Sequence, residues 1–361
     1  MKKKSLLIVI AVLLVAAMIA GCGTASGSTD DAGTAEAATT EESTDTAAAT
    51  EQQDRTYYYV APYMGHPYVY DHFLGFKYAA EEFGVKIVQS GPDDFDTQAA
   101  TEAFEQAIAK KPDGIITVMW DGSLVSAAKS AMEQGIPVII IEATVPDHGA
   151  SSYIGLDNYQ CGVDTAQELI NIAGDSGKLI LQGNWGASNT DAKLAGVKDC
   201  LAGTSWEVLA EVNDEAEAQK SIEVAKAAMN NYPDATAFLG LDSASGPGIA
   251  AAMEELNKEP DALTVVCNDR EDMTLEYVEM GYLDSTLCNK TAMQAYMAIA
   301  MLEDYYRFGL DNVPISADNK AANVSVFPTV VTTGTFTITA DNVTEFKHEN
   351  MDTYDTDLYV S

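Results

Sequence analysis

The chain has 361 residues, and its 55 acidic side chains against 20 basic ones give a formal net charge of -35. Such a negative surface repels phosphate backbones, which argues against a nucleic-acid-binding role. With 47% apolar and 21% charged residues, the composition is that of a globular protein, and the length predicts two domains.

The first 21 residues have the pattern of a secretory signal peptide. Residues 1–4 form a basic segment with three lysines, and an unbroken apolar run follows from Leu6 to Ala20. This run is shorter than the roughly 20 residues of a membrane span but suits a signal peptide. The small residues before Cys22 resemble the bacterial lipobox, in which that cysteine is lipidated. An uncleaved anchor is the alternative, and both interpretations place the remaining chain outside the cytoplasmic membrane.

The segment after Cys22 has a composition that cannot build a core. Residues 23–54 contain no Val, Ile, Leu, Met, Phe, Tyr or Trp, and they hold eight acidic residues and no basic one. Too little apolar surface is available to offset the entropy of ordering. We therefore predict that residues 22–56 are a lipidated cysteine followed by a disordered acidic tether, which holds a folded module off a membrane.

From Tyr57 onward, short β-branched or aromatic runs alternate with longer segments of helical period. Such alternation predicts βαβ units, with parallel sheets covered by helices on both faces. Nine runs are too many for one small sheet and indicate two lobes. The predicted strands are 57–61, 85–88, 114–118, 138–141, 178–182, 207–212, 236–240, 263–267 and 283–287.

An internal repeat supports the two lobes. Residues 111–121 match residues 232–242 in pattern, and each segment is followed by a helix and then by an apolar strand that ends in a carboxylate. In open parallel sheets, ligands bind beyond the carboxyl ends of the strands. Four acidic residues are therefore predicted at equivalent edges of two similar lobes, where they would line a cleft: Asp121, Glu142, Asp242 and Asp269.

The order and spacing of six short motifs carry a family resemblance. The motifs lie at 66–68, 135–138, 154–158, 233–242, 265–269 and 333–343. Together they resemble the type I periplasmic binding proteins of the ribose/galactose-binding kind, the substrate-binding lipoproteins of ABC importers. The resemblance implies an α/β fold of two similar doubly wound parallel-sheet lobes joined by a three-stranded hinge. It assigns residues 57–156 plus 290–327 to the first ligand-binding lobe and residues 157–289 plus 328–361 to the second.

In the first lobe, the resemblance implicates three ligand-binding residues. His66 stands where the family often has Asn, and Tyr68 stands where an aromatic ring packs on a sugar face. Glu142 stands at the position of a usual Asp, but Ala143 replaces the arginine that normally follows.

In the second lobe, the resemblance implicates a further set. Lys193 replaces a usual Arg in the segment that also contains Asn189, and Asn289 replaces a common Gln. Asp242 and Asp269 match positions that commonly contact hydroxyl groups. Because two arginines are replaced, the bidentate clamps typical of hexose and pentose sites are weaker here.

The residue types themselves suit a polyol. Sugar hydroxyls donate and accept hydrogen bonds, so carboxylates, amides and one cation can satisfy them, while aromatic faces cover the C–H surface. Trp120 and Trp185 are the candidate platforms, with core packing as the alternative for each. Glu142 and Asp269 could instead cap the helices that follow their strands.

Motifs of other functional classes are missing from the sequence. Residues 173–178 partly resemble a phosphate-binding loop, but the first Gly and the final Ser or Thr of that motif are missing. No dinucleotide fingerprint, nucleophile elbow or zinc spacing is present. Of the later cysteines, Cys161, Cys200, Cys267 and Cys288, the last two end strand-like runs and are expected to be buried thiols.

The predicted function is that of a solute-binding lipoprotein that captures a sugar or sugar-like molecule between its lobes and delivers it to an ABC importer. It is predicted to be a monomer without catalytic activity, cofactor, metal or nucleic-acid partner. Its partners would be the ligand, the permease and, through the lipid on Cys22, the membrane. Two alternatives remain open: a sensory module read by a membrane receptor or kinase, and the same fold binding an amine-bearing solute.

Overall fold

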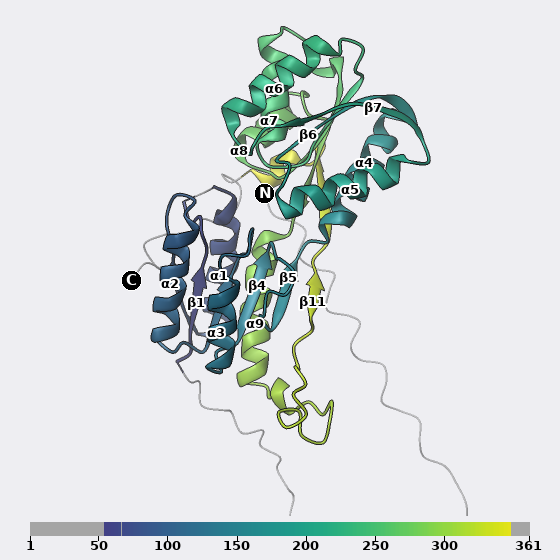
Figure 1. Ribbon diagram of the computed structural model, residues 1–361. Helices are drawn as coiled ribbons and strands as arrows, with labels where there is room; N and C mark the ends of the chain where they lie inside the picture. Colours follow the sequence, from purple (N-terminus) through teal and green to yellow (C-terminus); the bar gives the residue numbers. More distant parts are fainter. Residues whose placement is uncertain (1–53, 66, 348–361) are drawn as a thin grey trace, which may run out of the picture. The chain divides into compact units, whose positions relative to one another are not determined.

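The computed structural model describes residues 54–65 and 67–347, and these residues form two six-stranded sheets with helices on both faces (Figure 1). The predicted signal peptide, the tether and His66 lie outside the described residues. In the first sheet the strand order is β11-β5-β4-β3-β1-β2, and in the second it is β12-β10-β9-β8-β6-β7. The two orders correspond strand by strand, as the internal repeat predicts.

All nine predicted strands form, with ends that shift by at most two residues. In the first sheet they are β1 (Thr56–Val60), β2 (Lys86–Ser90), β3 (Gly114–Thr117) and β4 (Val138–Glu142). In the second sheet they are β6 (Ser176–Gly183), β7 (Ser205–Asn213), β8 (Ala237–Gly240), β9 (Thr264–Asn268) and β10 (Ser285–Asn289).

Three further strands were not predicted. β5 (Ser152–Gly155) and β11 (Val330–Thr332) pair in parallel in the first sheet, and β12 (Thr335–Thr339) pairs antiparallel with β10 in the second. β11 has three residues, too few to show a period, whereas β5 is as long as β3 and β8, and β12 alternates Thr with Phe and Ile, a strand signal that was missed. These strands lie at the sides of the sheets where the chain passes from one lobe to the other.

The helices are divided between the lobes by the core into which they pack. The first lobe, defined by the first sheet, contains α1 (Tyr70–Phe83), α2 (Thr97–Ala109), α3 (Val125–Glu133) and α9 (Thr291–Tyr306). The second lobe, defined by the second sheet, contains α4 (Asn158–Ala173), α5 (Ser188–Leu201), α6 (Ala218–Asn231), α7 (Ser245–Glu255) and α8 (Asp272–Glu279).

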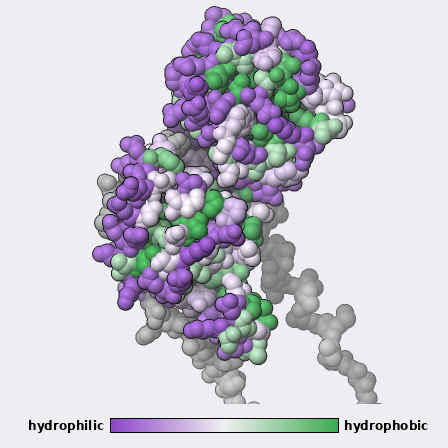
Figure 2. Space-filling view, in the orientation of Figure 1, coloured by the Kyte–Doolittle hydropathy of each residue, from purple (hydrophilic) through white to green (hydrophobic). Residues whose placement is uncertain are grey.

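Strand alternation explains how each sheet is buried on both faces. In β1, Tyr57 and Tyr59 pack with α1 and α9, whereas Val60 packs with α2 and α3. α1 and α9 approach so closely that a Cβ on Gly75 would lie 2.0 Å from the Ala292 carbonyl oxygen, so only glycine fits there. Hydrophilic residues cover much of the visible outer surface (Figure 2).

Three chain segments connect the lobes in the described part of the chain: residues 156–157 after β5, Lys290 after β10, and residues 333–334 between β11 and β12. They correspond to the predicted three-stranded hinge. The third crossing lies later than expected, because β11 still pairs with β5 in the first sheet. The chain therefore enters the second sheet after Thr332 rather than after residue 327.

A buried ionic cluster ties the beginning of the described fold to α9. Glu303 is fully buried and accepts hydrogen bonds from Arg55 Nε at 2.8 Å and from the Tyr57 hydroxyl at 2.6 Å. Arg307 Nε lies 3.2 Å from the same carboxylate. Because charges this deep are stable only when paired, the cluster fixes the register between β1 and α9.

Candidate functional site

The ends of two corresponding strands share an unusual backbone conformation. Glu142 ends β4 with φ 67°, and Asp269 follows β9 with φ 73°. A left-handed conformation is costly for residues other than glycine and is often found at binding sites. The two lobes thus present one carboxylate each, at equivalent strand ends, through the same local geometry.

The other two predicted strand-end carboxylates organise the helices that follow. Asp121 Oδ1 accepts a hydrogen bond from Ser123 N at 2.8 Å, and Asp242 Oδ1 accepts from Ala244 N at 2.9 Å and Ser245 N at 3.1 Å. The capping alternative considered for Glu142 is wrong, because β4 leads into strand β5 and not into a helix.

A cavity of about 780 Å³ lies beyond these strand ends. Nine of the ten predicted ligand-binding residues line it, and the tenth, His66, lies outside the described residues. The lining includes Tyr68, Trp120, Asp121, Glu142, Asn189, Lys193, Asp242, Asp269 and Asn289. Two separate lobes therefore bring these residues together around one space.

A hydrogen-bond network sets the geometry of the Glu142 carboxylate. Asn289 Nδ2 donates to Glu142 Oε2 at 2.7 Å and to the Tyr68 hydroxyl at 3.1 Å. Gln294 of α9 holds both Asn289 and Glu142 in place. Its Nε2 donates to Asn289 Oδ1 at 2.7 Å, and its Oε1 accepts from Glu142 N at 2.9 Å. Gln294 is fully buried and was not predicted, because a single polar residue in an apolar helix carries no spacing signal.

Close packing of α4 against α5 positions Lys193, the basic residue among those described at the cavity wall. A Cβ on Gly162 would lie 1.9 Å from the carbonyl oxygen of Lys193, so the glycine lets the helices touch there. Lys193 is 5% exposed, and its Nζ donates to the Leu241 carbonyl at 3.2 Å. The ammonium group is thereby held against the loop that carries Asp242.

Comparison with known proteins agrees with this arrangement of two lobes around a polar cavity. The family model described as "Periplasmic binding protein domain" matches residues 57–309. The chain belongs to this family. The match spans both lobes and all the described site residues, so the predicted family and the two-lobed α/β fold are confirmed.

Solved structures of periplasmic binding proteins give the same result. The arabinose-binding protein AraP from Geobacillus stearothermophilus has 28% identity and a TM-score of 0.74, covering 81% of this chain and 99% of AraP. A sugar-binding protein of a sugar ABC transporter from Bacillus halodurans has 24% identity and a TM-score of 0.76, covering 81% and 100%. GanP, a glucose-galactose binding protein from Geobacillus stearothermophilus, has 22% identity and a TM-score of 0.69, covering 80% and 99%.

Membership of the periplasmic binding protein family implies an extracytoplasmic location. The family and the solved neighbours are substrate-binding proteins and not enzymes. Among the described residues, no helix combines the length and apolar character needed to cross a membrane. Cys267 and Cys288 are buried free thiols, as predicted, and Cys161 is a third.

Electrostatics in this periplasmic binding protein site are governed by burial. Burial raises the pKa of Glu142 to about 7, the Tyr68 hydrogen bond opposes this rise, and nearby Asp269 adds to it. Burial lowers the pKa of Lys193, but the surrounding Cys161, Asp269, Glu142 and Asp242 raise it more, so the net pKa is raised. Among the described residues, the site therefore holds one permanent cation, Lys193, and a carboxyl group, Glu142, with a pKa near neutral pH.

A second carboxyl group behind the cavity wall modifies Asp242. Burial, followed by the charge of Asp214, raises the pKa of Asp242 to about 8. Asp214 is fully buried and accepts a hydrogen bond from Ser245 Oγ at 2.6 Å. Asp214 was not predicted as a site residue, because it follows a different strand, β7, and lies near Asp242 only in the folded protein.

Aromatic rings form another part of the cavity wall. The Phe95 ring centroid lies 6.2 Å from that of Trp120 and 6.3 Å from that of Tyr63. Phe95 is 55% exposed although it lines the cavity, and it was not predicted. Trp120 and Trp185 both line the cavity, and each also packs against a lobe core. Each ring therefore has one part that faces the cavity and another that packs in the core.

Proposed function

We propose that the protein is an extracytoplasmic solute-binding lipoprotein that captures a sugar in the cavity between its lobes and delivers it to an ABC importer. The observation that carries this proposal is the convergence of carboxylates, amides, a lysine and aromatic rings from both lobes on one space of about 780 Å³. This composition matches what a polyol needs, because each hydroxyl both donates and accepts.

The chemistry can be assigned residue by residue. Glu142, Asp242 and Asp269 would accept from sugar hydroxyls, and Asn189 and Lys193 would donate to them. The Tyr68, Trp120 and Phe95 rings would cover the C–H faces. Glu142 would be aligned by Asn289, so its remaining lone pairs point in a constant direction.

Hinge closure would couple binding to delivery. A ligand that contacts Glu142 in one lobe and Asp269 in the other gains more free energy in the closed state than in the open one. The three connecting segments are short, as expected of hinges that absorb domain closure. The permease would then recognise the closed form.

The solved neighbours support the choice of a sugar. AraP is named as an arabinose-binding protein, and it is the neighbour among those compared above whose identity exceeds 25%. The Cys22 lipid anchor, the cleaved signal peptide and the acidic tether complete the proposal as the means of keeping the monomeric binding module near its importer.

Calorimetry with the purified protein tests the proposal. Pentoses, hexoses and inositols are titrated singly, and the melting temperature is followed in parallel. A ligand at about 100 times its dissociation constant adds about 2.7 kcal/mol of stability. If no polyol binds, the sugar assignment is wrong.

A transport experiment separates delivery from sensing. Uptake of the labelled sugar should be lost when the gene is deleted and restored by the wild-type gene. It should be restored less well by a Cys22→Ala variant, which lacks the thiol that carries the lipid. Unchanged uptake in the deletion strain would contradict delivery and favour a sensory role.

A further inference from the structure

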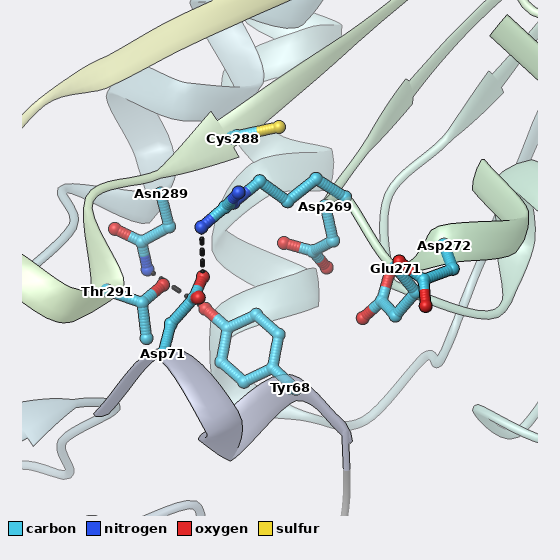
Figure 3. A pocket seen from close by; sticks show the side chains of 9 residues that line it. Tyr68, Asp71, Asp269, Glu271, Asp272, Cys288, Asn289 and Thr291 are labelled. Atoms are coloured by element: carbon cyan, nitrogen blue, oxygen red, sulfur yellow. Dashed lines mark hydrogen bonds and ion pairs between the residues drawn. The ribbon is translucent and has the colours of Figure 1, made fainter. Parts of the chain in front are cut away.

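A second, smaller cavity of about 60 Å³ lies beside the large one. Its walls come from the start of α1, from the segment between β9 and α8, and from the end of β10 (Figure 3). Tyr68, Asp269 and Asn289 line both cavities. The two cavities therefore share part of their wall.

Acidic residues outnumber basic ones among the described residues that line the small cavity. Asp71, Asp269, Glu271 and Asp272 line it, whereas Arg270 is the one basic residue among the described lining residues. Arg270 Nη2 lies 2.6 Å from Asp71 Oδ2, so its charge is engaged by the first lobe. Lys193 lines the large cavity but not the small one. Burial, and then the charge of nearby Asp269, raises the pKa of Glu271, so a cation bound beside it would favour the ionised form of this carboxyl group.

Glu271 is the residue that points to a missing partner. Both of its carboxyl oxygens are shielded from solvent, and neither has a hydrogen-bond partner in the described part of the chain. Although Glu271 precedes α8, its side chain does not cap that helix. Figure 3 shows its carboxyl group on the same side of the pocket as that of Asp269. A buried carboxyl group without a partner is costly, and a bound donor would remove that cost.

The chemistry of the missing donor follows from the size and the ligand set. No group of three or more acidic, histidine or cysteine side chains among the described residues is arranged to hold a metal ion, and a metal needs several converging ligands. An ammonium group is a compact cation with three donors. A space of about 60 Å³ can hold such a group, since one water takes roughly 30 Å³.

We propose that the small cavity is a subsite for an ammonium group carried by the ligand, so that the protein prefers amino sugars to their hydroxyl parents. This inference rests on the proposed sugar-binding function. It adds a substituent-specific subsite made by Glu271 and Asp269, with Tyr68 and Asn289 at its junction with the large cavity.

Paired calorimetric titrations of the purified full-length protein test the subsite. Glucosamine, galactosamine and mannosamine are each compared with glucose, galactose and mannose at about pH 7, and with the N-acetyl derivatives, which lack the charge. We expect at least one amino sugar to bind ten-fold or more tightly than its parent and its N-acetyl derivative.

Two variants locate the effect. Glu271→Gln keeps the shape but removes the charge, and it should weaken the preferred amino sugar at least ten-fold while changing its parent less than three-fold. Glu276→Gln removes the same charge from an exposed position on α8 and should change neither.

The outcomes distinguish this inference from the function on which it rests. If neutral sugars bind as tightly as every amino sugar, or if Glu271→Gln weakens both classes equally, the ammonium subsite is wrong and sugar binding stands. If no sugar of either class binds, both proposals fall.

Discussion

Asn289 Nδ2 donates to the Glu142 carboxylate at 2.7 Å, which joins the end of β10 in the second lobe to the end of β4 in the first. The two residues are separated by 147 positions in the sequence. The contact therefore aligns a predicted ligand acceptor of the first lobe with a side chain of the second.

Replacing Asn289 by Ala should weaken ligand binding by about 1–3 kcal/mol, because Glu142 then loses a buried donor and Gln294 loses an acceptor. Calorimetry measures the change, with a sugar that binds the wild type in the titrations proposed above. Asn230→Ala, at an exposed position on α6, is the matched control and should bind as the wild type does. Equal affinities for the two variants would show that the network does not contribute to the site.

Glu142→Gln should change the pH dependence of stability. The pKa of Glu142 is raised in the folded state from 4.5 to about 7, so folding favours the protonated form. Its contribution is fully present below about pH 4.5 and is lost as the pH rises through about 7. Relative to Glu142→Gln, the wild type should therefore lose up to about 3 kcal/mol between pH 4.5 and 8.

Urea denaturation of both proteins at several pH values measures this difference. Gln keeps an acceptor for Asn289, so the comparison isolates ionisation. A constant difference across the range would mean that Glu142 ionises in the folded protein as it does in the unfolded chain.

Arg55→Met should destabilise the fold by about 3 kcal/mol, because it removes one buried partner of Glu303 and leaves Arg307 and Tyr57 to compensate. Chemical denaturation measures the loss. The double variant Arg55→Met, Glu303→Met should recover part of it, since no buried carboxylate then lacks its partner. A single variant as stable as the wild type would exclude a structural role for the cluster.

Phe95→Ala should weaken sugar binding by about 0.5–1.5 kcal/mol without lowering the melting temperature. The ring lines the cavity but is 55% exposed, so it contributes more to a ligand than to the core. Phe308→Ala removes a ring that is 67% exposed and does not line the cavity, and it serves as the control. A loss of stability in Phe95→Ala without a loss of affinity would reverse this assignment.

Much of the fold could be predicted from local pattern. Most of the nine strands were predicted because a strand buried on both faces is an uninterrupted apolar run, as in Val138–Ile141. β11 was missed because its three residues show no period, and the pairing of β11 with β5 and of β12 with β10 joins segments far apart in the chain. The boundary near residue 327 was misplaced for the same reason.

The sequence by itself determined the two lobes, the strand ends and the four carboxylates that follow them, because strand periodicity and the direction of parallel strands are encoded in neighbouring residues. Only the tertiary structure decided which side chains meet: Gln294 at Glu142, Asp214 behind Asp242 and Phe95 beside Trp120, while Glu271 has no side-chain hydrogen-bond partner among the described residues. These contacts join residues that are distant along the chain, and burial, which sets their charge states, exists only after the lobes have packed.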